Sequence, residues 1–109
     1  MLEQRIWQMH YDTALTTLYL GSNSLGDIGA QHLGDALRYN TTLTVLDLED
    51  NNIGDVGAQH LGDALQYNAT LTDLYLKSNQ IGEIGAQHLG DGLQYNTVII
   101  ICTVSIPCL

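Results

Sequence analysis

Three histidines recur at one spacing, and each is followed three residues later by an aspartate. The pairs are His32 and Asp35, His60 and Asp63, and His88 and Asp91. Histidine beside a carboxylate can coordinate zinc or act as a general acid–base pair. The pattern around these pairs is helical, and packed helix axes lie roughly 8–10 Å apart, whereas each zinc ligand must lie about 2 Å from the metal. We therefore expect no shared metal ion, and we interpret each histidine as a solvated or half-buried side chain with a local carboxylate partner.

Two other chemical motifs are incomplete. Gly29 and Gly34 have the spacing of glycines in a phosphate-binding loop, but Asp35 stands where such a loop carries lysine. A carboxylate in that place repels phosphate. The two cysteines, Cys102 and Cys108, accompany no histidine in a nucleophilic arrangement. The sequence therefore predicts a protein that is not an enzyme, with no catalytic residue, no cofactor and no metal.

The charge balance limits the partners. The 109 residues include 12 Asp and Glu but only 3 Lys and Arg, which gives a net charge of −9. Nucleic acids and anionic membranes both attract cations, so we expect neither as a partner. The longest apolar stretch, residues 98–102, is too short to span a bilayer. Residues 1–10 lack the pattern of a signal peptide, and the two cysteines form no disulfide framework, so we expect a cytoplasmic location.

The elements that carry these residues are repeated. The chain contains three gapless units of 28 residues, at 13–40, 41–68 and 69–96. Gly-Ala-Gln-His-Leu-Gly-Asp recurs unchanged in each unit. In the first part of a unit, Leu18 and Leu20 alternate with Tyr19, which predicts a strand with one buried face. Asn23 follows where the chain must turn, and its amide can satisfy backbone groups there.

The second part of each unit has the spacing of a helix. Its apolar positions in the first two units are Ile28, Ala30, Leu33, Leu37, Val56, Ala58, Leu61 and Leu65. Gly26-Asp27 opens the first helix, with the carboxylate near the positive end of the helix dipole. Asn40 closes it, because asparagine tolerates the left-handed conformation. One unit cannot bury its apolar stripe alone, so we expect the units to stack with parallel strands inside a curve and helices outside.

The repeated pattern also resembles a known family. Leu-x-x-Leu-x-Leu-x-x-Asn-x-(Ile/Leu)-Gly-x-x-Gly-Ala-x-x-Leu-x-x-x-Leu-x-x-Asn resembles the repeats of ribonuclease inhibitor, and it is similar to the repeat domains of NOD-like receptors and Ran GTPase-activating proteins. The resemblance covers residues 13–96. It implies an α/β leucine-rich-repeat solenoid, a horseshoe segment with parallel strands on the concave face and helices on the convex face. It also implies protein recognition on the concave sheet or its rim.

The two ends depart from the repeat. Residues 1–12 carry Leu2, Ile6 and Met9 on one helical face, which predicts an N-terminal half-repeat helix that caps the stack.

Residues 97–109 begin a fourth unit and stop before a helix, with Ile99, Cys102 and Val104 expected in the core columns. Solenoids need a polar cap at each end. Three interpretations therefore stay open: a truncated or fragmentary chain, a tail that folds back as a cap, or an apolar end through which copies associate.

The candidate binding residues lie on the concave face, between the core leucines. They are Thr17, Tyr19, Gly21, Val45, Asp47, Glu49, Asp50, Asp73, Tyr75 and Lys77. Most differences between the three units fall there, whereas the exposed helix positions Gln31, His32 and Asp35 do not differ at all. Plain drift after duplication would have changed both faces, so the pattern favours a binding surface on the concave face. Tyrosines offer contact area at low entropy cost, and the acids would attract a basic patch on a protein partner.

A second set of tyrosines precedes each closing asparagine. Tyr39, Tyr67 and Tyr95 are predicted to form a structural column that covers the helix ends.

Three functions remain open. The first is a non-catalytic module that binds a protein on its concave face. The second is a structural spacer or fragment of a longer array of the NOD-like-receptor type, without its own partner. The third is a Ran-type GTPase activator. Activation commonly needs an arginine at the phosphates. The strand-to-helix turns at 21–24, 49–52 and 77–80 contain no arginine, so this function is the least favoured.

Overall fold

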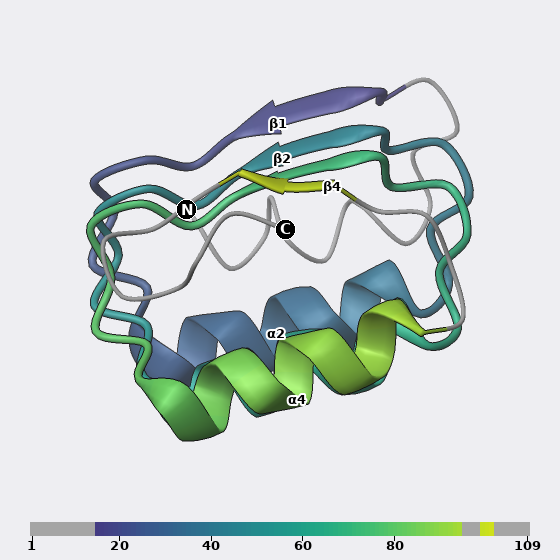
Figure 1. The fold of residues 1–109 in the computed structure, drawn as a ribbon. Coiled ribbons are helices and arrows are strands. Elements are labelled where there is room, and N and C mark those ends of the chain that lie inside the picture. The colour runs from purple at the N-terminus through teal and green to yellow at the C-terminus, as the bar shows by residue number, and fades with distance from the viewer. Residues whose placement is uncertain (1–14, 95–98, 102–109) are drawn as a thin grey trace.

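The computed structural model describes residues 15–94 and 99–101, in which strands and helices alternate along the chain. The elements are β1 (Thr17–Tyr19), α2 (Gly26–Leu37), β2 (Val45–Asp47), α3 (Asp55–Leu65), β3 (Asp73–Tyr75), α4 (Glu83–Leu93) and β4 (Ile99–Ile101). The strands form one parallel sheet in the order β1-β2-β3-β4, and the three helices cover one side of it (Figure 1). The predicted α/β solenoid is confirmed.

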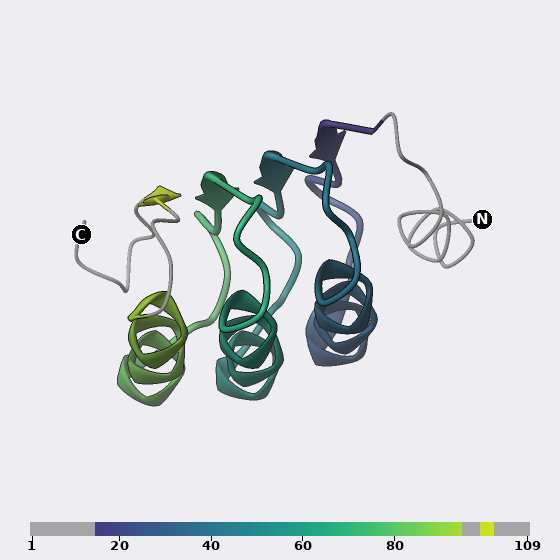
Figure 2. The same ribbon diagram turned by 90° about the vertical axis from the view of Figure 1, so that its right-hand side faces the viewer.

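The stack bends toward its sheet. Viewed along the strands, β1 to β3 lie closer to one another than α2 to α4 do (Figure 2). This follows from the widths of the two elements, since neighbouring strands are about 4.8 Å apart and packed helices are roughly 8–10 Å apart. The sheet therefore forms the inner face of the curve, as the sequence predicts.

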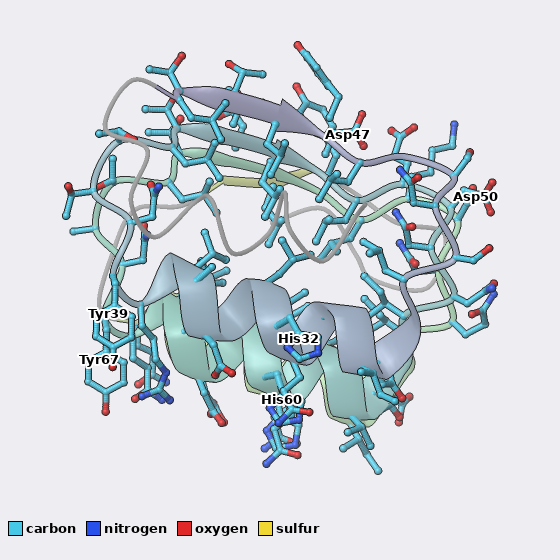
Figure 3. All side chains as sticks on the ribbon, turned by 180° about the vertical axis from the view of Figure 1, so that it is seen from behind. His32, Tyr39, Asp47, Asp50, His60 and Tyr67 are labelled. Atoms are coloured by element: carbon cyan, nitrogen blue, oxygen red, sulfur yellow. The ribbon has the colours of Figure 1, made fainter. Side chains whose placement is uncertain are left out.

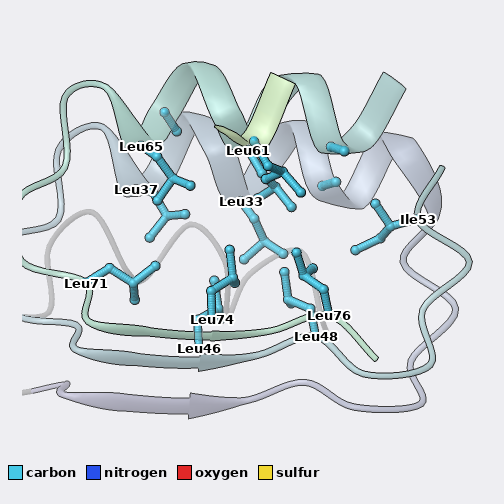
Figure 4. Packing of buried hydrophobic residues seen from close by; sticks show 14 of the residues in the cluster. Leu33, Leu37, Leu46, Leu48, Ile53, Leu61, Leu65, Leu71, Leu74 and Leu76 are labelled. Carbon is cyan, nitrogen blue, oxygen red and sulfur yellow. The ribbon is translucent and has the colours of Figure 1, made fainter. Parts of the chain in front are cut away.

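The core consists of leucine columns between the sheet and the helices. Leu46 and Leu74 lie opposite each other on β2 and β3, and both are fully buried. They point toward Leu33 and Leu61 of the helices (Figure 4). Burying a leucine side chain contributes about 1.5–3 kcal/mol. Because each column continues through successive units, the units depend on one another for their stability.

An asparagine ladder joins the turns that follow the strands. Asn51 is fully buried, and its Oδ1 accepts hydrogen bonds from the backbone amides of Asn23 (3.0 Å) and Leu25 (3.3 Å) of the preceding unit. Its Nδ2 donates to the carbonyls of Leu20 and Glu49. Asn79 repeats the pattern one unit later toward the amides of Asn51 and Ile53. The predicted role of these asparagines in satisfying backbone groups is confirmed, and the bonds also link one unit to the next.

An aspartate ladder joins the helices in the opposite direction. Asp27 stands in the first turn of α2, as expected from the sequence, but its carboxylate serves the next helix. Its Oδ1 accepts hydrogen bonds from the amides of Gly54 (2.7 Å) and Gly57 (3.0 Å) at the start of α3. Asp55 repeats this arrangement toward Gly82 and Gly85 of α4. Two of the amides that the starts of α3 and α4 leave free are thus satisfied by the preceding unit.

Glycines bring the helices close together. A Cβ atom on Gly34 of α2 would lie 2.9 Å from the carbonyl oxygen of His60 in α3, so only glycine fits without a shift. Gly62 has the same relation to the carbonyl of His88 in α4. The unchanged Gly in the repeated motif therefore has a packing role.

The helical stripe differs from its predicted composition at one position of the unit. The sequence places Ile28 and Val56 in the buried stripe, but 71% and 55% of these side chains are exposed. The buried residues of α2 are Gly29, Ala30, Leu33, Gly34, Ala36 and Leu37. This face is centred on positions 29, 33 and 37, and Ile28 lies about 100° away from residue 29 around the helix. The prediction for Ile28 and Val56 is therefore wrong.

The helix ends also differ from the prediction. Asn40 does not adopt the left-handed conformation; the non-glycine residues with positive φ in the described part of the chain are Ser22, Ser24, Asp50, Asn52 and Ser78. Asn40 is buried, and its Oδ1 accepts hydrogen bonds from the amides of Thr42 and Leu43. The helix ends earlier, at Leu37, and the asparagine instead shapes the entry to the next strand.

The fourth strand has a different register from the one expected. Ile99 pairs with Asp73 and Ile100 pairs with Leu74, whereas the repeat length places Cys102 at the register of Leu74. The apolar run of residues 98–102 has no alternation between apolar and polar residues, so its sequence specifies the register weakly. The predictions for the cap at 1–12, for Tyr95 and for Cys102 and Val104 lie outside the described residues.

Candidate functional site

Two rows of side chains cross the face of the sheet that the helices leave open. Strand register places Thr17 beside Val45 and Val45 beside Asp73 in the first row. In the second row, Tyr19 lies beside Asp47 and Asp47 beside Tyr75. Side chains on adjacent parallel strands at the same register share a face, and the alternating leucines occupy the other face. The sequence-predicted strand residues are therefore brought together.

The face continues into the turns beyond the strand ends. Asp47 lies over the sheet, Asp50 lies in the turn that follows β2, and both are on the opposite side of the molecule from His32 and His60 (Figure 3). Gly21, Asp50 and Lys77 are exposed in their turns, and Glu49 is half-buried. We call the ten predicted residues in these rows and turns the sheet face.

The side chains of the sheet face differ in exposure. Tyr19 is 71% exposed, whereas Tyr75 is half-buried. The remaining strand residues of the set, Thr17, Val45, Asp47 and Asp73, are all half-buried. Every member is therefore reachable by a macromolecule. The half-buried ones have fewer conformations to lose on binding, which favours a tighter complex.

Two carboxylates of the sheet face are held in place. Asp47 Oδ1 accepts a hydrogen bond of 3.0 Å from the backbone amide of Glu49. Asp50 Oδ2 accepts a hydrogen bond of 2.9 Å from the hydroxyl of Ser22 in the neighbouring turn. The sequence places Ser22 at the rim of this face, next to the ten residues of the sheet face. Its signal in the sequence is its position, since Ser22 and Asp50 stand at the same place in successive units.

The turns that carry Asp50 have an unusual backbone. Ser22, Asp50 and Ser78 occupy equivalent places and have φ values of 58°, 55° and 61°. Non-glycine residues adopt such values infrequently, with Asp and Asn among the more tolerant. The backbone N–H of Ser22 donates to the carbonyl of Glu49, and that of Asp50 donates to the carbonyl of Lys77. The parallel hydrogen bonding of the sheet thus extends into the turns and keeps their side chains in line.

The histidines lie apart from this face. His32, His60 and His88 are half-buried side chains on α2, α3 and α4. Within the described residues, no three His, Cys, Asp or Glu side chains are grouped so that they could hold a metal ion. Gly29 and Gly34 are buried inside α2 and belong to no loop. The helices in the described part of the chain are all too short or too polar to cross a membrane.

A second aromatic cluster lies at the C-terminal ends of the helices. Tyr39 and Tyr67 are there, as predicted, but 69% and 65% of their side chains are exposed, so neither closes the core. The guanidinium carbon of Arg38 lies 5.0 Å from the centre of the Tyr67 ring. The repeat pattern does not predict this cation–π contact, because the position of Arg38 is glutamine in the other two units (Gln66 and Gln94).

A family model matches the repeated units. The model described as "Leucine Rich repeat" matches three consecutive segments, at residues 11–34, 39–62 and 67–90. These segments have the same period of 28 residues as the sequence repeat and together cover about two thirds of the chain. A comparison with curated proteins found no match.

Solved structures share the fold at low sequence identity. A structure described as "Leiomodin-1 Actin-Binding Site 2 (ABS2)" has a TM-score of 0.83 and 21% identity over 96% of this chain. The tropomodulin C-terminal domain of Caenorhabditis elegans has a TM-score of 0.73 and 18% identity over 95% of this chain. The chain spans 61% of the length of each of these structures.

Proposed function

The chain belongs to the leucine-rich-repeat family, and from that premise we propose that it is a non-catalytic module that binds a protein partner on its sheet face. The sheet forms the inner face of the curved stack. Its side chains that point away from the helices take no part in the leucine core. The observation that carries the proposal is the contrast between the two faces. Side chains on the sheet face differ from unit to unit, whereas Gln31, His32 and Asp35 on the helices recur unchanged.

The chemistry of the sheet face indicates what kind of partner it takes. Four carboxylates lie on it, at Asp47, Glu49, Asp50 and Asp73, and Lys77 is its one cation. Such a surface attracts a basic patch and slows the association of acidic proteins. Two tyrosines add apolar contact area with a polar tip. We therefore propose a basic partner protein, neither a nucleic acid nor a membrane.

The size of the surface limits the affinity. A standard interface buries about 800 Å² on each partner. Three strands of three residues with their turns provide a small face for that purpose. We expect the module to bind weakly by itself and its association rate to fall as the salt concentration rises.

A pair of matched charge reversals tests the proposal. One variant carries Glu49→Lys and Asp73→Lys on the sheet face, and the other carries Asp35→Lys and Asp91→Lys on the helices. Both change the net charge equally. Each variant and the unchanged chain are immobilised and exposed to a cytosolic extract, and bound proteins are quantified by mass spectrometry. We expect basic proteins that the unchanged chain enriches to be lost from the sheet-face variant only. Equal loss from both variants would contradict the proposal.

Actin is tested as one defined candidate partner, because a structure with a similar fold is described as an actin-binding site. The leiomodin structure is described as an actin-binding site, so purified actin filaments are tested for cosedimentation with the chain. At 21% identity this similarity shows a shared fold only, so the experiment decides whether actin is a partner of this chain.

The two other functions make different predictions. A spacer without its own partner enriches no protein in a manner that depends on either pair of acids. A Ran-type activator raises the rate of GTP hydrolysis when it is added to a Ran GTPase, and the turns that would face the phosphates offer Asn23, Asn51 and Asn79 but no arginine. The side-chain amides of these asparagines are already bound to backbone carbonyls. We therefore expect no stimulation.

A further inference from the structure

Tyr19, Asp47 and Tyr75 form a row in which one carboxylate lies between two aromatic side chains. They are direct register neighbours on β1, β2 and β3. Adjacent parallel strands are about 4.8 Å apart, so the strands that carry the two tyrosines are separated by roughly 10 Å. A carboxylate flanked by two aromatic side chains in one row has the chemistry of a receptor for a cation.

One cation–π contact in this structure shows how far a guanidinium lies from a tyrosine ring. At the other side of the molecule, the guanidinium carbon of Arg38 lies 5.0 Å from the centre of the Tyr67 ring. Cation–π attraction extends to about 6 Å from the centre of a ring. A guanidinium above Asp47 is therefore within reach of rings carried by β1 and β3, whose backbones are roughly 10 Å apart.

The carboxylate between the tyrosines is oriented and available. Asp47 is half-buried, and its Oδ1 accepts the hydrogen bond from the Glu49 amide. Its Oδ2 accepts no hydrogen bond from the described part of the chain. One oxygen thus fixes the side chain, and the other can accept a hydrogen bond from an incoming N–H group.

We propose that Tyr19, Asp47 and Tyr75 bind the side chain of one arginine of the partner protein. The proposal rests on the proposed function and names the chemical group that this face recognises. A guanidinium is planar, stacks on tyrosine rings and loses its hydration more easily than an ammonium group, whereas lysine is a compact and strongly hydrated charge. Two flanking rings therefore favour arginine over lysine, and Asp47 provides the charge complement.

Short peptides test this inference without the unidentified partner. The full chain is titrated with acetyl-Gly-Arg-Gly-amide, with the matching lysine peptide and with the citrulline peptide, which has nearly the shape of arginine without its charge. Binding is followed by NMR through the ring resonances of Tyr19 and Tyr75. We expect the arginine peptide to bind most tightly, the lysine peptide to bind roughly twofold to fivefold more weakly and the citrulline peptide to produce no saturable shift. Equal binding of the arginine and citrulline peptides, or no binding of either, overturns the proposal.

Variants connect the binding to the row. Asp47→Asn keeps an acceptor for the Glu49 amide but removes the charge, and we expect it to weaken arginine-peptide binding roughly twofold to fivefold. Replacing both tyrosines, by Tyr19→Leu and Tyr75→Leu, keeps apolar bulk and removes the aromatic faces, and we expect a loss of at least that size. The controls are Asp35→Asn and Tyr39→Leu, which make the same chemical changes on exposed residues away from the sheet face. A control that weakens binding as much as its counterpart also overturns the proposal.

The failure of this inference and the failure of the proposed function are distinguishable. If the charge reversals at Glu49 and Asp73 abolish partner capture while the arginine peptide does not bind, the sheet face is an interface that does not recognise arginine in this row. If the peptide binds as described while partner capture is insensitive to both reversals, the arginine receptor stands and the larger interface does not.

Discussion

Asp27 caps the helix of the next unit, because its Oδ1 lies 3.0 Å from the backbone nitrogen of Gly57 near the start of α3. The same oxygen also accepts the Gly54 amide at 2.7 Å. A carboxylate at this place satisfies two of the amides that a helix start leaves free and also favours the positive end of the helix dipole. The contact therefore stabilises α3 and joins two units in one step.

Removing this carboxylate is expected to destabilise the stack. Asp27→Ala loses both hydrogen bonds, and the loss of an N-terminal cap costs about 0.5–2 kcal/mol. The measurement is urea denaturation followed by far-UV circular dichroism. Glu83→Ala is the matched control, because Glu83 has the same place in the third unit and is exposed. We expect the control to stay within about 0.5 kcal/mol of the unchanged chain. Equal losses in the two variants would show that Asp27 acts only on its own helix.

Replacing Asn51 of the asparagine ladder is expected to lower the free energy of unfolding more than Asp27→Ala does. Asn51→Ala leaves the amides of Asn23 and Leu25 without their acceptor inside the stack. The carbonyl of Leu20 loses one of its two side-chain donors and keeps Asn23 Nδ2. Each buried group left unsatisfied costs about 1–3 kcal/mol, so we expect a loss of at least roughly 2 kcal/mol in the free energy of unfolding.

Asn52 provides the control for this variant. It is the next residue, is exposed and has a φ of 58°, which glycine adopts freely. We expect Asn52→Gly to leave the midpoint of urea denaturation nearly unchanged. A similar loss in both variants would mean that the turn, and not the buried amide of Asn51, determines the stability.

The architecture could be predicted from periodicity because equivalent leucines recur once in every unit of 28 residues. Leu46 and Leu74 share a column since they stand at the same place in units of equal length, and alternation assigns them to one face. The sheet face followed from the same argument, as the residues between core leucines must lie on the opposite side. Tyr19, Asp47 and Tyr75 could therefore be placed on one row from the repeat length alone.

The contacts between units could not be predicted in this way. Asp27 has the sequence context of a residue that caps its own helix, and only the stacking distance brings its carboxylate to Gly54 and Gly57. Ile28 has an apolar side chain near the helical stripe, yet a rotation of one residue leaves it exposed. The contact of Arg38 with Tyr67 depends on side-chain direction across two units. These features arise from three-dimensional spacing that a pattern along the chain does not contain.

The third unit provides a case in which repeat consensus and structure disagree. Gly92 stands where the other units have Ala36 and Ala64, so consensus favours Gly92→Ala, and alanine is the better helix former by about 1 kcal/mol. However, a Cβ atom on Gly92 would collide with the carbonyl oxygen of Gly62 in α3. We expect Gly92→Ala to lower the free energy of unfolding in urea. A gain in stability would show that α4 can move away from α3 at little cost.

The glycines of the repeated motif give the sharpest test of helix packing, because one substitution can be made at two equivalent places with opposite expectations. A Cβ atom on Gly62 would collide with the backbone carbonyl of His88 in α4, and a backbone atom cannot rotate aside. Overpacking of this kind costs about 1–3 kcal/mol, which outweighs the gain in helix propensity of about 1 kcal/mol. We therefore expect Gly62→Ala to destabilise the chain in urea denaturation.

Gly90 occupies the same place in α4, and a Cβ atom there would meet nothing within 4 Å among the described residues. With no packing cost, Gly90→Ala should stabilise the chain by about 0.4–1 kcal/mol, mainly because alanine restricts the unfolded state. Hydrogen exchange adds a local readout, since Gly62→Ala should speed exchange of amides in α4 while Gly90→Ala should slow it. If both variants gain stability, the close approach of α3 and α4 is not what requires glycine in this motif.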